Sequence, residues 1–253
     1  ATSDQDEAAF IIDRIKKLVL EEGYSRSDIA ILYRSNAQSR VVEQALFNAG
    51  MPYRVYGGLR FFERAEIKHA LAYLRLMDNA DDDNSFSRVV NFPARGIGAR
   101  SVEQLQDIST AQATSLYRAI HRMEGRAQAG LKKFADLIER MRFETRGLGL
   151  ADLVDKVINE SGLVAHFQAD KDGEDRVENL KELVNAAASF AIAEGYYQDA
   201  AATMVDEEKL ITPLADFLSH ASLEAGDNAA AAGQDAIQLM TAHSAKGLEF
   251  KCV

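Results

Sequence analysis

The sequence predicts an α/β fold that is interrupted by a mostly helical segment. Three short apolar runs have the length and composition of buried strands, and they lie at residues 29–33, 52–56 and 236–241. The first two alternate with helical patterns, which is the order found in parallel α/β sheets. The long stretch before the third strand is almost wholly helical in its apolar spacing. We therefore expect residues 1–64 to open the α/β domain, residues 65–235 to form an inserted helical domain, and residues 236–253 to complete the sheet.

Local signals place the helices of the first segment. Ser3 and Asp6 can cap a helix whose apolar residues recur at helical spacing, and Gly23 ends it. A second helix is predicted from about residue 37 to residue 48, where Gly50 closes it. The first helix precedes the first strand, and the second helix lies between the first and second strands.

Two apolar stripes indicate long helices in the middle segment. Their members are Ile67, Leu71, Leu74 and Met77 in the first, and Val177, Leu180, Val184, Ala187 and Ala191 in the second. Because such stripes cover only one face of a helix, we expect them to form the core of the helical domain.

Charge and composition favour a soluble protein of the reducing cytosol. The net charge is −10, the chain has one cysteine, and no apolar run approaches a membrane span. Residues 51–146 carry 16 Lys/Arg against 12 Asp/Glu, whereas residues 147–236 carry 5 against 18. This asymmetry indicates one face for phosphates and another kept away from them, or simply two solvated faces of different sign.

The third strand runs directly into a loop that is rich in chemically active residues. His, Ser, Lys, Gly and Glu fall within the seven positions 243–249. Open α/β sheets bind ligands beyond the carboxyl ends of their strands. We therefore expect phosphate or nucleic-acid chemistry at this loop, with a purely structural strand end as the alternative.

A second candidate anion site lies in the middle segment. Two glycines flank Ile97, so backbone N–H groups can approach an anion without a side chain in the way. Ser101 with Gln104 three residues later predicts a capping box and hence a helix N-terminus behind the loop. Arg95 and Arg100 can add charge-assisted contacts. The alternative is a tight turn with Ile97 packed inward.

Five ordered segments resemble motifs of one family, the UvrD/Rep/PcrA group of superfamily 1 DNA helicases. They are Tyr33–Arg40 (similar to motif IVa), Gly57–Lys68 (IVb), Asn91–Gly98 (the GIG element of domain 2B), Arg176–Leu183 (IVc) and His243–Phe250 (motif V). The resemblance implies a partial RecA-like domain, 2A-like, with a 2B-like helical insert. Ala242 departs from the aliphatic residue expected before motif V, which affects packing rather than chemistry.

The resemblance also implies roles for residues of the last loop. Thr241 and His243 would contact single-stranded DNA, and Lys246 and Gly247 would lie near the triphosphate of ATP. Glu249 would accept a hydrogen bond from the ribose hydroxyl. Each role suits the chemistry of its residue, because an ammonium complements phosphate and a carboxylate accepts from hydroxyls.

Further contacts with DNA are implied outside this loop. The GIG element would grip the duplex backbone through Arg95, Gly96, Ile97, Gly98, Arg100 and Ser101. Arg60 precedes Phe61-Phe62 and could contact single-stranded DNA, with packing of this segment into a core as the alternative.

By this resemblance the chain is an internal segment of an ATP-dependent helicase that unwinds DNA from 3′ to 5′ in repair or replication. The longer protein would use ATP and Mg²⁺, bind a junction of single- and double-stranded DNA, and meet DNA-repair proteins. No Gly-Lys dipeptide and hence no Walker A loop is present, so we expect the chain alone to hold no cofactor and to hydrolyse nothing. No metal site is expected.

Two alternatives remain open at this stage. The chain could be a non-catalytic regulatory module that binds DNA, or binds proteins through its acidic 147–236 segment. It could also be part of a RecBCD- or AddAB-type helicase-nuclease. Any oligomer of the chain could be an artefact of unpaired strand edges.

Overall fold

The computed structural model describes residues 4–171, 173–196, 212–226 and 234–253. Two compact units divide the chain. Unit 1 comprises residues 1–64 and 220–253, and unit 2 comprises residues 65–219. The second boundary falls inside a helix, earlier than the position near residue 236 predicted from the sequence, because the end of that helix contacts unit 1 residues.

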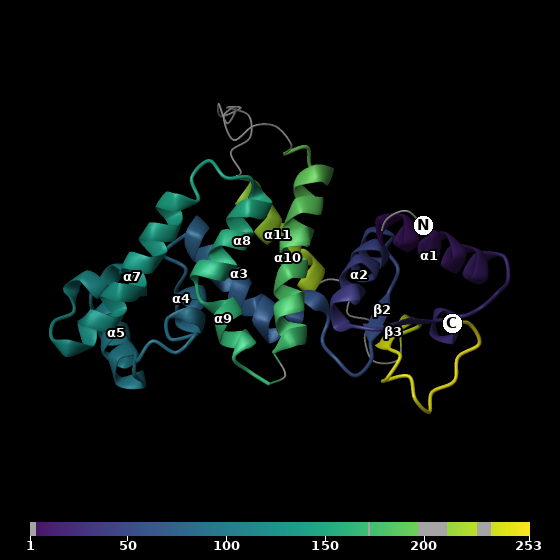
Figure 1. Ribbon diagram of the computed structural model, residues 1–253, viewed down its shortest axis with the longest axis horizontal. Helices are drawn as coiled ribbons and strands as arrows, with labels where there is room; N and C mark the ends of the chain where they lie inside the picture. The colour runs from purple at the N-terminus through teal and green to yellow at the C-terminus, as the bar shows by residue number, and fades with distance from the viewer. Residues whose placement is uncertain (1–3, 172, 197–211, 227–233) are drawn as a thin grey trace. The chain divides into compact units, whose positions relative to one another are not determined.

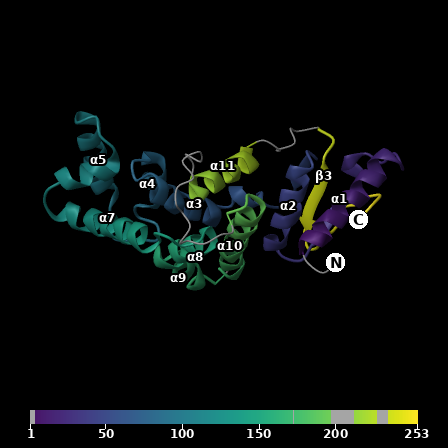
Figure 2. The ribbon, with the colours of Figure 1, turned by 90° about the horizontal axis from the view of Figure 1, so that it is seen from above.

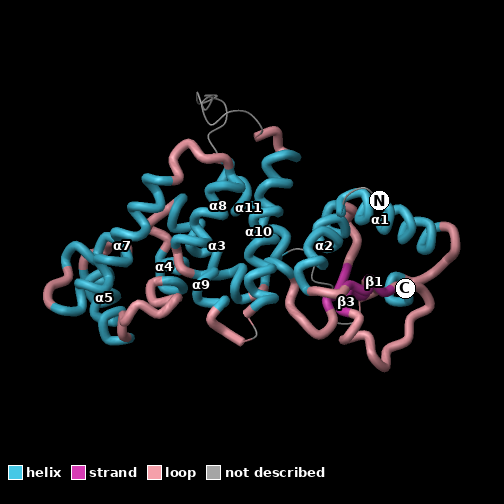
Figure 3. Tube along the Cα trace, viewed as in Figure 1, coloured by secondary structure: helices cyan, strands magenta, loops and turns pink. Residues whose placement is uncertain are grey.

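Unit 1 contains a small parallel sheet whose central strand comes last in the chain. The strands are β1 (Ala30–Tyr33), β2 (Tyr53–Val55) and β3 (Ile237–Thr241), in the order β1-β3-β2. Tyr33 pairs with Thr241 and Val55 with Leu239. All three predicted strands are confirmed within one residue at each end, and Figure 3 shows them together.

Two helices pack on this sheet. They are α1 (Asp4–Leu20) and α2 (Ser39–Asn48), which lie along β3 in Figure 2. Ile15 of α1, Leu46 of α2 and Leu239 of β3 share one buried core. The predicted cap Ser3 lies outside the described residues. Short 3₁₀ turns complete the unit at Arg26–Asp28, Asn36–Gln38 and Phe61–Glu63.

Unit 2 is helical in the part of it that the structure describes (Figure 1). Its helices are α3 (Ala65–Asp78), α4 (Asp83–Val89), α5 (Ala99–Ala111), α6 (Leu116–Ala119), α7 (Arg126–Glu144), α8 (Leu150–Glu160), α9 (Leu163–Gln168) and α10 (Glu174–Ala193), with a 3₁₀ turn at Ile120–Arg122. The helix α11 (Pro213–Gly226) crosses the boundary into unit 1. Of the helices in the described ranges, none combines the length and the apolar character that crossing a bilayer requires.

The two predicted stripes have different outcomes. All four members of the first are buried on α3. On α10 the buried face includes Leu183 and Phe190, whereas Val184 and Ala191 are only half-buried. The prediction is confirmed for Val177, Leu180 and Ala187, which are buried, and it misses at Val184 and Ala191, where the neighbouring residues on the helix face the core instead.

We predict that Leu239→Ala destabilises unit 1 by about 3 kcal/mol, because Leu239 is fully buried on the central strand. Hydrogen exchange of the β3 amides measures this loss directly. Leu32→Ala on β1 is the control, because Leu32 is 39% exposed; it should cost less than about 1 kcal/mol. Equal losses in the two variants would contradict the central role of β3.

Candidate nucleic-acid and nucleotide interface

The loop after β3 begins at the carboxyl edge of the sheet and is shaped by its first residues. Thr241 Oγ1 lies 2.9 Å from Ser244 Oγ and accepts from the Ser244 N–H at 3.2 Å. Gly247 adopts a left-handed conformation (φ 87°) that permits the next reversal of the chain. The loop ends beside β1, where the Ala30 N–H donates to the carbonyl of Cys252 at 2.9 Å.

Four of the five loop residues singled out from the sequence are exposed. They are His243, Lys246, Gly247 and Glu249, whereas Thr241 is half-buried and engaged with Ser244. In the part of the chain that the structure describes, the side chains of His243, Lys246 and Glu249 make no hydrogen bond or ion pair. The structure thus brings together a cation, a carboxylate and an imidazole that are available to a ligand.

A glycine turn after β2 presses against this loop. A Cβ atom on Gly57 would lie 2.9 Å from Ser244 Oγ, and the φ of Gly57 is 74°. The left-handed conformation favours glycine at this position, and the close approach leaves little room for a side chain. The sequence predicts Gly57-Gly58 as the end of the second strand and as part of a motif, and the same pair is a signal for close approach of another segment.

The loop between α4 and α5 in unit 2 is held by one asparagine. Asn91 Oδ1 accepts from the backbone N–H groups of Arg95, at 2.8 Å, and Ile97, at 3.2 Å. Gly96 between them is left-handed (φ 71°). Ile97 is buried and packs so closely on α7 that a Cβ atom on Gly130 would lie 3.1 Å from it. The loop therefore combines an inward Ile97 with exposed flanking glycines.

Helix α5 begins at Ala99, so the predicted capping box is wrong. Gly98 is the N-cap, in an extended conformation, and its carbonyl accepts from the Ser101 N–H at 3.0 Å. Ser101 is consequently the third helical residue rather than the cap. Since Gly98 has no side chain, α5 begins without a side-chain cap, and Gly98, Ala99 and Arg100 at its start are exposed.

Arg95 points into unit 2 rather than outward. Its guanidinium donates to Tyr73 Oη at 2.6 Å and to the carbonyl of Ser161 at 2.8 Å. It also donates to the carbonyls of Val89 and Pro93. Four of its five N–H donors are engaged in this way. This geometry favours a positioning role for Arg95 over the direct phosphate contact expected from the sequence.

Two histidines with no predicted role meet at the same loop. Phe92 stacks on His69 with ring centroids 3.9 Å apart, and it meets His166 edge-on at 4.8 Å. Burial lowers the pKa of His69. These ring contacts hold Phe92 between the two histidines at the start of the loop.

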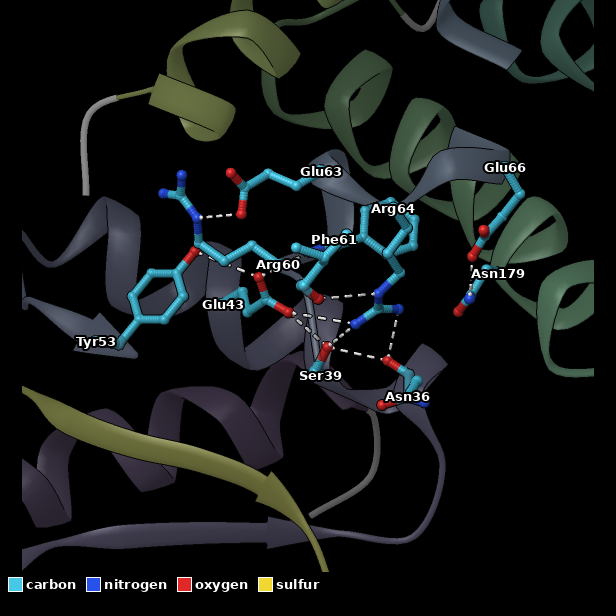
Figure 4. A network of polar contacts seen from close by, with 11 residues as sticks. Asn36, Ser39, Glu43, Tyr53, Arg60, Phe61, Glu63, Arg64, Glu66 and Asn179 are labelled. Atoms are coloured by element: carbon cyan, nitrogen blue, oxygen red, sulfur yellow. Dashed lines mark hydrogen bonds and ion pairs between the residues drawn. The ribbon is translucent and has the colours of Figure 1, made fainter. Parts of the chain in front are cut away.

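Arg60 is also committed to contacts inside the protein (Figure 4). Its Nε donates to Glu63 at 3.0 Å, and its two terminal nitrogens donate to the carbonyls of Glu224 at 3.4 Å and Ala225 at 2.5 Å. The last two groups are carbonyls at the C-terminal end of α11, where a cation is stabilising. Because Arg60 is only 8% exposed, the geometry favours the packing alternative over contact with a DNA strand.

A buried carboxylate, Glu43, organises the neighbouring network. It accepts from Ser39 Oγ at 2.5 Å and from the Phe61 N–H at 3.0 Å, and lies 3.6 Å from a terminal nitrogen of Arg64. Burial raises the pKa of Glu43, and these hydrogen bonds oppose the shift. In unit 2, Asn179 donates to Glu66 at 2.7 Å, joining the segments that resemble motifs IVc and IVb.

We predict that Glu43→Ala lowers the free energy of unfolding by about 3 kcal/mol, because it leaves the Arg64 guanidinium buried without its carboxylate. Urea unfolding followed by circular dichroism measures the loss. Glu22→Ala is the matched control, since Glu22 pairs with Arg14 at 2.7 Å on the surface. That exposed pair should contribute less than about 1 kcal/mol. A Glu43 variant as stable as the control would refute the prediction.

Glu224 predicts a pH dependence of stability. Burial raises its pKa to about 7, a shift that Arg40 opposes and Glu43 reinforces. A carboxyl whose pKa is raised by folding stabilises the protein below its ordinary pKa, and this contribution is lost as the pH rises through about 7. The Glu224 contribution therefore falls with pH, by at most about 1.4 kcal/mol per pH unit.

Urea unfolding of the wild type and Glu224→Gln between about pH 5 and about pH 8 isolates this contribution. We expect the wild type to lose more stability than the variant as the pH rises. Parallel pH profiles would show that Glu224 does not titrate in this range.

Comparisons with known proteins identify the family to which the chain belongs. A family model described as "UvrD-like helicase C-terminal domain" matches residues 1–253. The chain is 46% identical to DNA helicase II of Escherichia coli (strain K12), over 99% of this chain and 34% of that protein. It is 35% identical to ATP-dependent DNA helicase PcrA of Bacillus subtilis (strain 168), over 98% of this chain and 33% of that protein. The chain thus spans about a third of the length of these relatives. It belongs to the family of UvrD-like helicase C-terminal domains.

Proposed function

We propose that the chain is a segment of an ATP-dependent DNA helicase that unwinds duplex DNA in the 3′ to 5′ direction. Unit 1 would be part of the second RecA-like domain, and unit 2 the 2B-like insert. The observation that carries the proposal is the loop after β3, whose His243, Lys246 and Glu249 are exposed at the sheet edge. The relatives named DNA helicase support it, and because both are bacterial they support a location in the bacterial cytoplasm. Repair proteins remain predicted partners.

In this proposal the loop serves a DNA strand and a nucleotide. His243 would contact the strand, and Thr241 would act mainly by shaping the turn through its bond to Ser244. Lys246 would neutralise phosphate charge, and Glu249 would accept from a ribose hydroxyl. These side chains share one short loop. Binding of the nucleotide can therefore change the affinity of the loop for the DNA strand, and binding of the strand can change its affinity for the nucleotide.

ATP would supply the phosphoryl transfer that drives unwinding. The exposed ammonium of Lys246 and the open backbone at Gly247 fit a triphosphate. Magnesium beside a nucleotide is held mostly by phosphates, water and one or two carboxylates, and the described residues gather no group of three His, Cys, Asp or Glu side chains for a metal. We therefore derive no step through the metal from this chain.

The start of α5 would hold the duplex. Its start has no side-chain cap and lies at exposed residues with Arg100 beside it, so its N–H groups and this guanidinium can bind phosphates without reading sequence. Arg95 and Asn91 would act by holding the loop in this shape. Gly96 and Gly98 leave the backbone open, since a Cβ atom on either would meet nothing within 4 Å.

Fluorescence anisotropy of a labelled duplex with a 3′ single-stranded tail tests this proposal across about 50 to 200 mM salt. We expect wild-type binding to weaken steeply with salt. Arg100→Ala should bind several-fold more weakly, with a salt slope reduced by about 1. Lys16→Ala on α1 is the control, because it removes an exposed cation from another surface. Equal effects of both substitutions, or no binding by the wild type, would contradict the proposal.

A further inference from the structure

A buried tyrosine on α3 is bonded at two points to the loop before α5. The Tyr73 side chain is fully buried (0% exposed). Its hydroxyl donates to the carbonyl of Phe92 at 2.5 Å and accepts from a terminal nitrogen of Arg95 at 2.6 Å. Both partners belong to residues 91–98, so one hydroxyl joins α3 to two separate places in this loop.

The Tyr73 hydroxyl can serve both partners because it keeps its proton. A tyrosine hydroxyl has one proton to donate, and the Phe92 carbonyl is nearer to it than the Val89 carbonyl, which lies 3.3 Å away. Burial raises the pKa of Tyr73 to about 12, a shift that Arg95 opposes. At neutral pH the oxygen is therefore protonated, and it can donate and accept at the same time.

A second residue of α3 holds the same loop. His69 lies one helical turn before Tyr73, so the two side chains project from one face of the helix. The His69 ring stacks on Phe92 with ring centroids 3.9 Å apart. Phe92 is thus held by its ring and by its carbonyl, and α3 provides both contacts.

Arg95 carries this anchoring toward α5. Its guanidinium donates to the carbonyl of Ser161 as well as to Tyr73, and its Cζ lies 5.7 Å from the centroid of the Tyr73 ring. Only residues 96–97 separate Arg95 from Gly98, the N-cap of α5. The position of Arg95 therefore limits where the helix can begin.

We propose that Tyr73 is a positioning residue for duplex binding, because its hydroxyl fixes the loop that precedes the exposed start of α5. The inference rests on the proposed function, in which the start of α5 holds phosphates of the duplex. It extends that function to a residue of another helix, which is fully buried and so acts through Phe92 and Arg95 rather than by touching DNA. Donors bind phosphate best when they are held in place before the ligand arrives.

A second buried tyrosine in unit 2 provides a matched control. Tyr117 is 8% exposed, and its hydroxyl lies 2.8 Å from a carboxylate oxygen of Glu139 and 3.4 Å from the carbonyl of Ala135. Both partners belong to α7, and neither contact involves residues 91–98. Tyr117→Phe therefore removes a buried hydroxyl from the same unit without altering a contact of the loop.

The first test measures binding of a labelled blunt-ended duplex to the whole chain by fluorescence anisotropy, with the active protein counted by stoichiometric titration. Tyr73→Phe should bind about tenfold more weakly, because a carbonyl and a guanidinium lose the same partner. Tyr117→Phe should bind within about twofold of the wild type.

Two outcomes of this test would overturn the inference and leave the proposed function standing. One is an equal loss of binding in Tyr73→Phe and Tyr117→Phe. The other is unchanged binding in Tyr73→Phe when Arg100→Ala weakens it. No duplex binding by the wild type would contradict the proposed function, and the inference with it.

A double-mutant cycle tests the route through Arg95. When Tyr73→Phe is combined with Arg95→Gln, the loss of affinity should be smaller than the product of the two single losses, because both substitutions break the same hydrogen bond. Losses that multiply would overturn this route.

Hydrogen–deuterium exchange without DNA tests the positioning itself, since it does not depend on binding. Peptides that cover residues 91–98 should exchange faster in Tyr73→Phe than in the wild type, and at the wild-type rate in Tyr117→Phe. Unchanged exchange of this loop in Tyr73→Phe would overturn the inference whatever the duplex measurements show.

Discussion

The insertion of β3 between β1 and β2 is the constraint on which unit 1 depends. The two edge strands do not pair with each other, so both strand pairings of the described sheet involve β3, and only an isolated bridge from Ile29 to Cys252 lies outside them. The sheet is incomplete until the chain has passed through unit 2 and returned. The same pairing places the loop with His243 and Lys246 at the middle of the carboxyl edge, where parallel sheets bind ligands.

In both units, polar side chains hold a loop backbone in place through hydrogen bonds. In unit 2, Asn91 accepts from the loop backbone before α5, and Arg95 of this loop donates to the carbonyl of Ser161. Neither side chain caps α5, whose N-terminus has no side-chain cap. In unit 1, Arg60 bonds to the end of α11 while Glu43 and Arg64 fix the segment around Phe61. Phosphate recognition of this kind needs fixed donors more than it needs many charges.

Much of the local structure could be predicted from the sequence, and the tertiary roles of charged residues could not. Apolar periodicity located the three strands and the stripe on α3, because burial of one face imposes that period. The same reasoning missed the order β1-β3-β2, which depends on pairing between distant segments. Arg60 and Arg95 resembled surface cations, but each finds several internal acceptors that only the fold brings together. Ser101 matched a capping box, yet Gly98 already provides the N-cap.

The central claim is that the two units bind different parts of one DNA junction, the duplex at α5 and the strand at the edge of the sheet. Hydrogen–deuterium exchange with and without a 3′-tailed duplex tests it most directly. The account predicts slower exchange at two separate places, residues 96–101 in unit 2 and the turns after β2 and β3 in unit 1. Slower exchange confined to other surfaces, or no change at either place under saturating DNA, would contradict it.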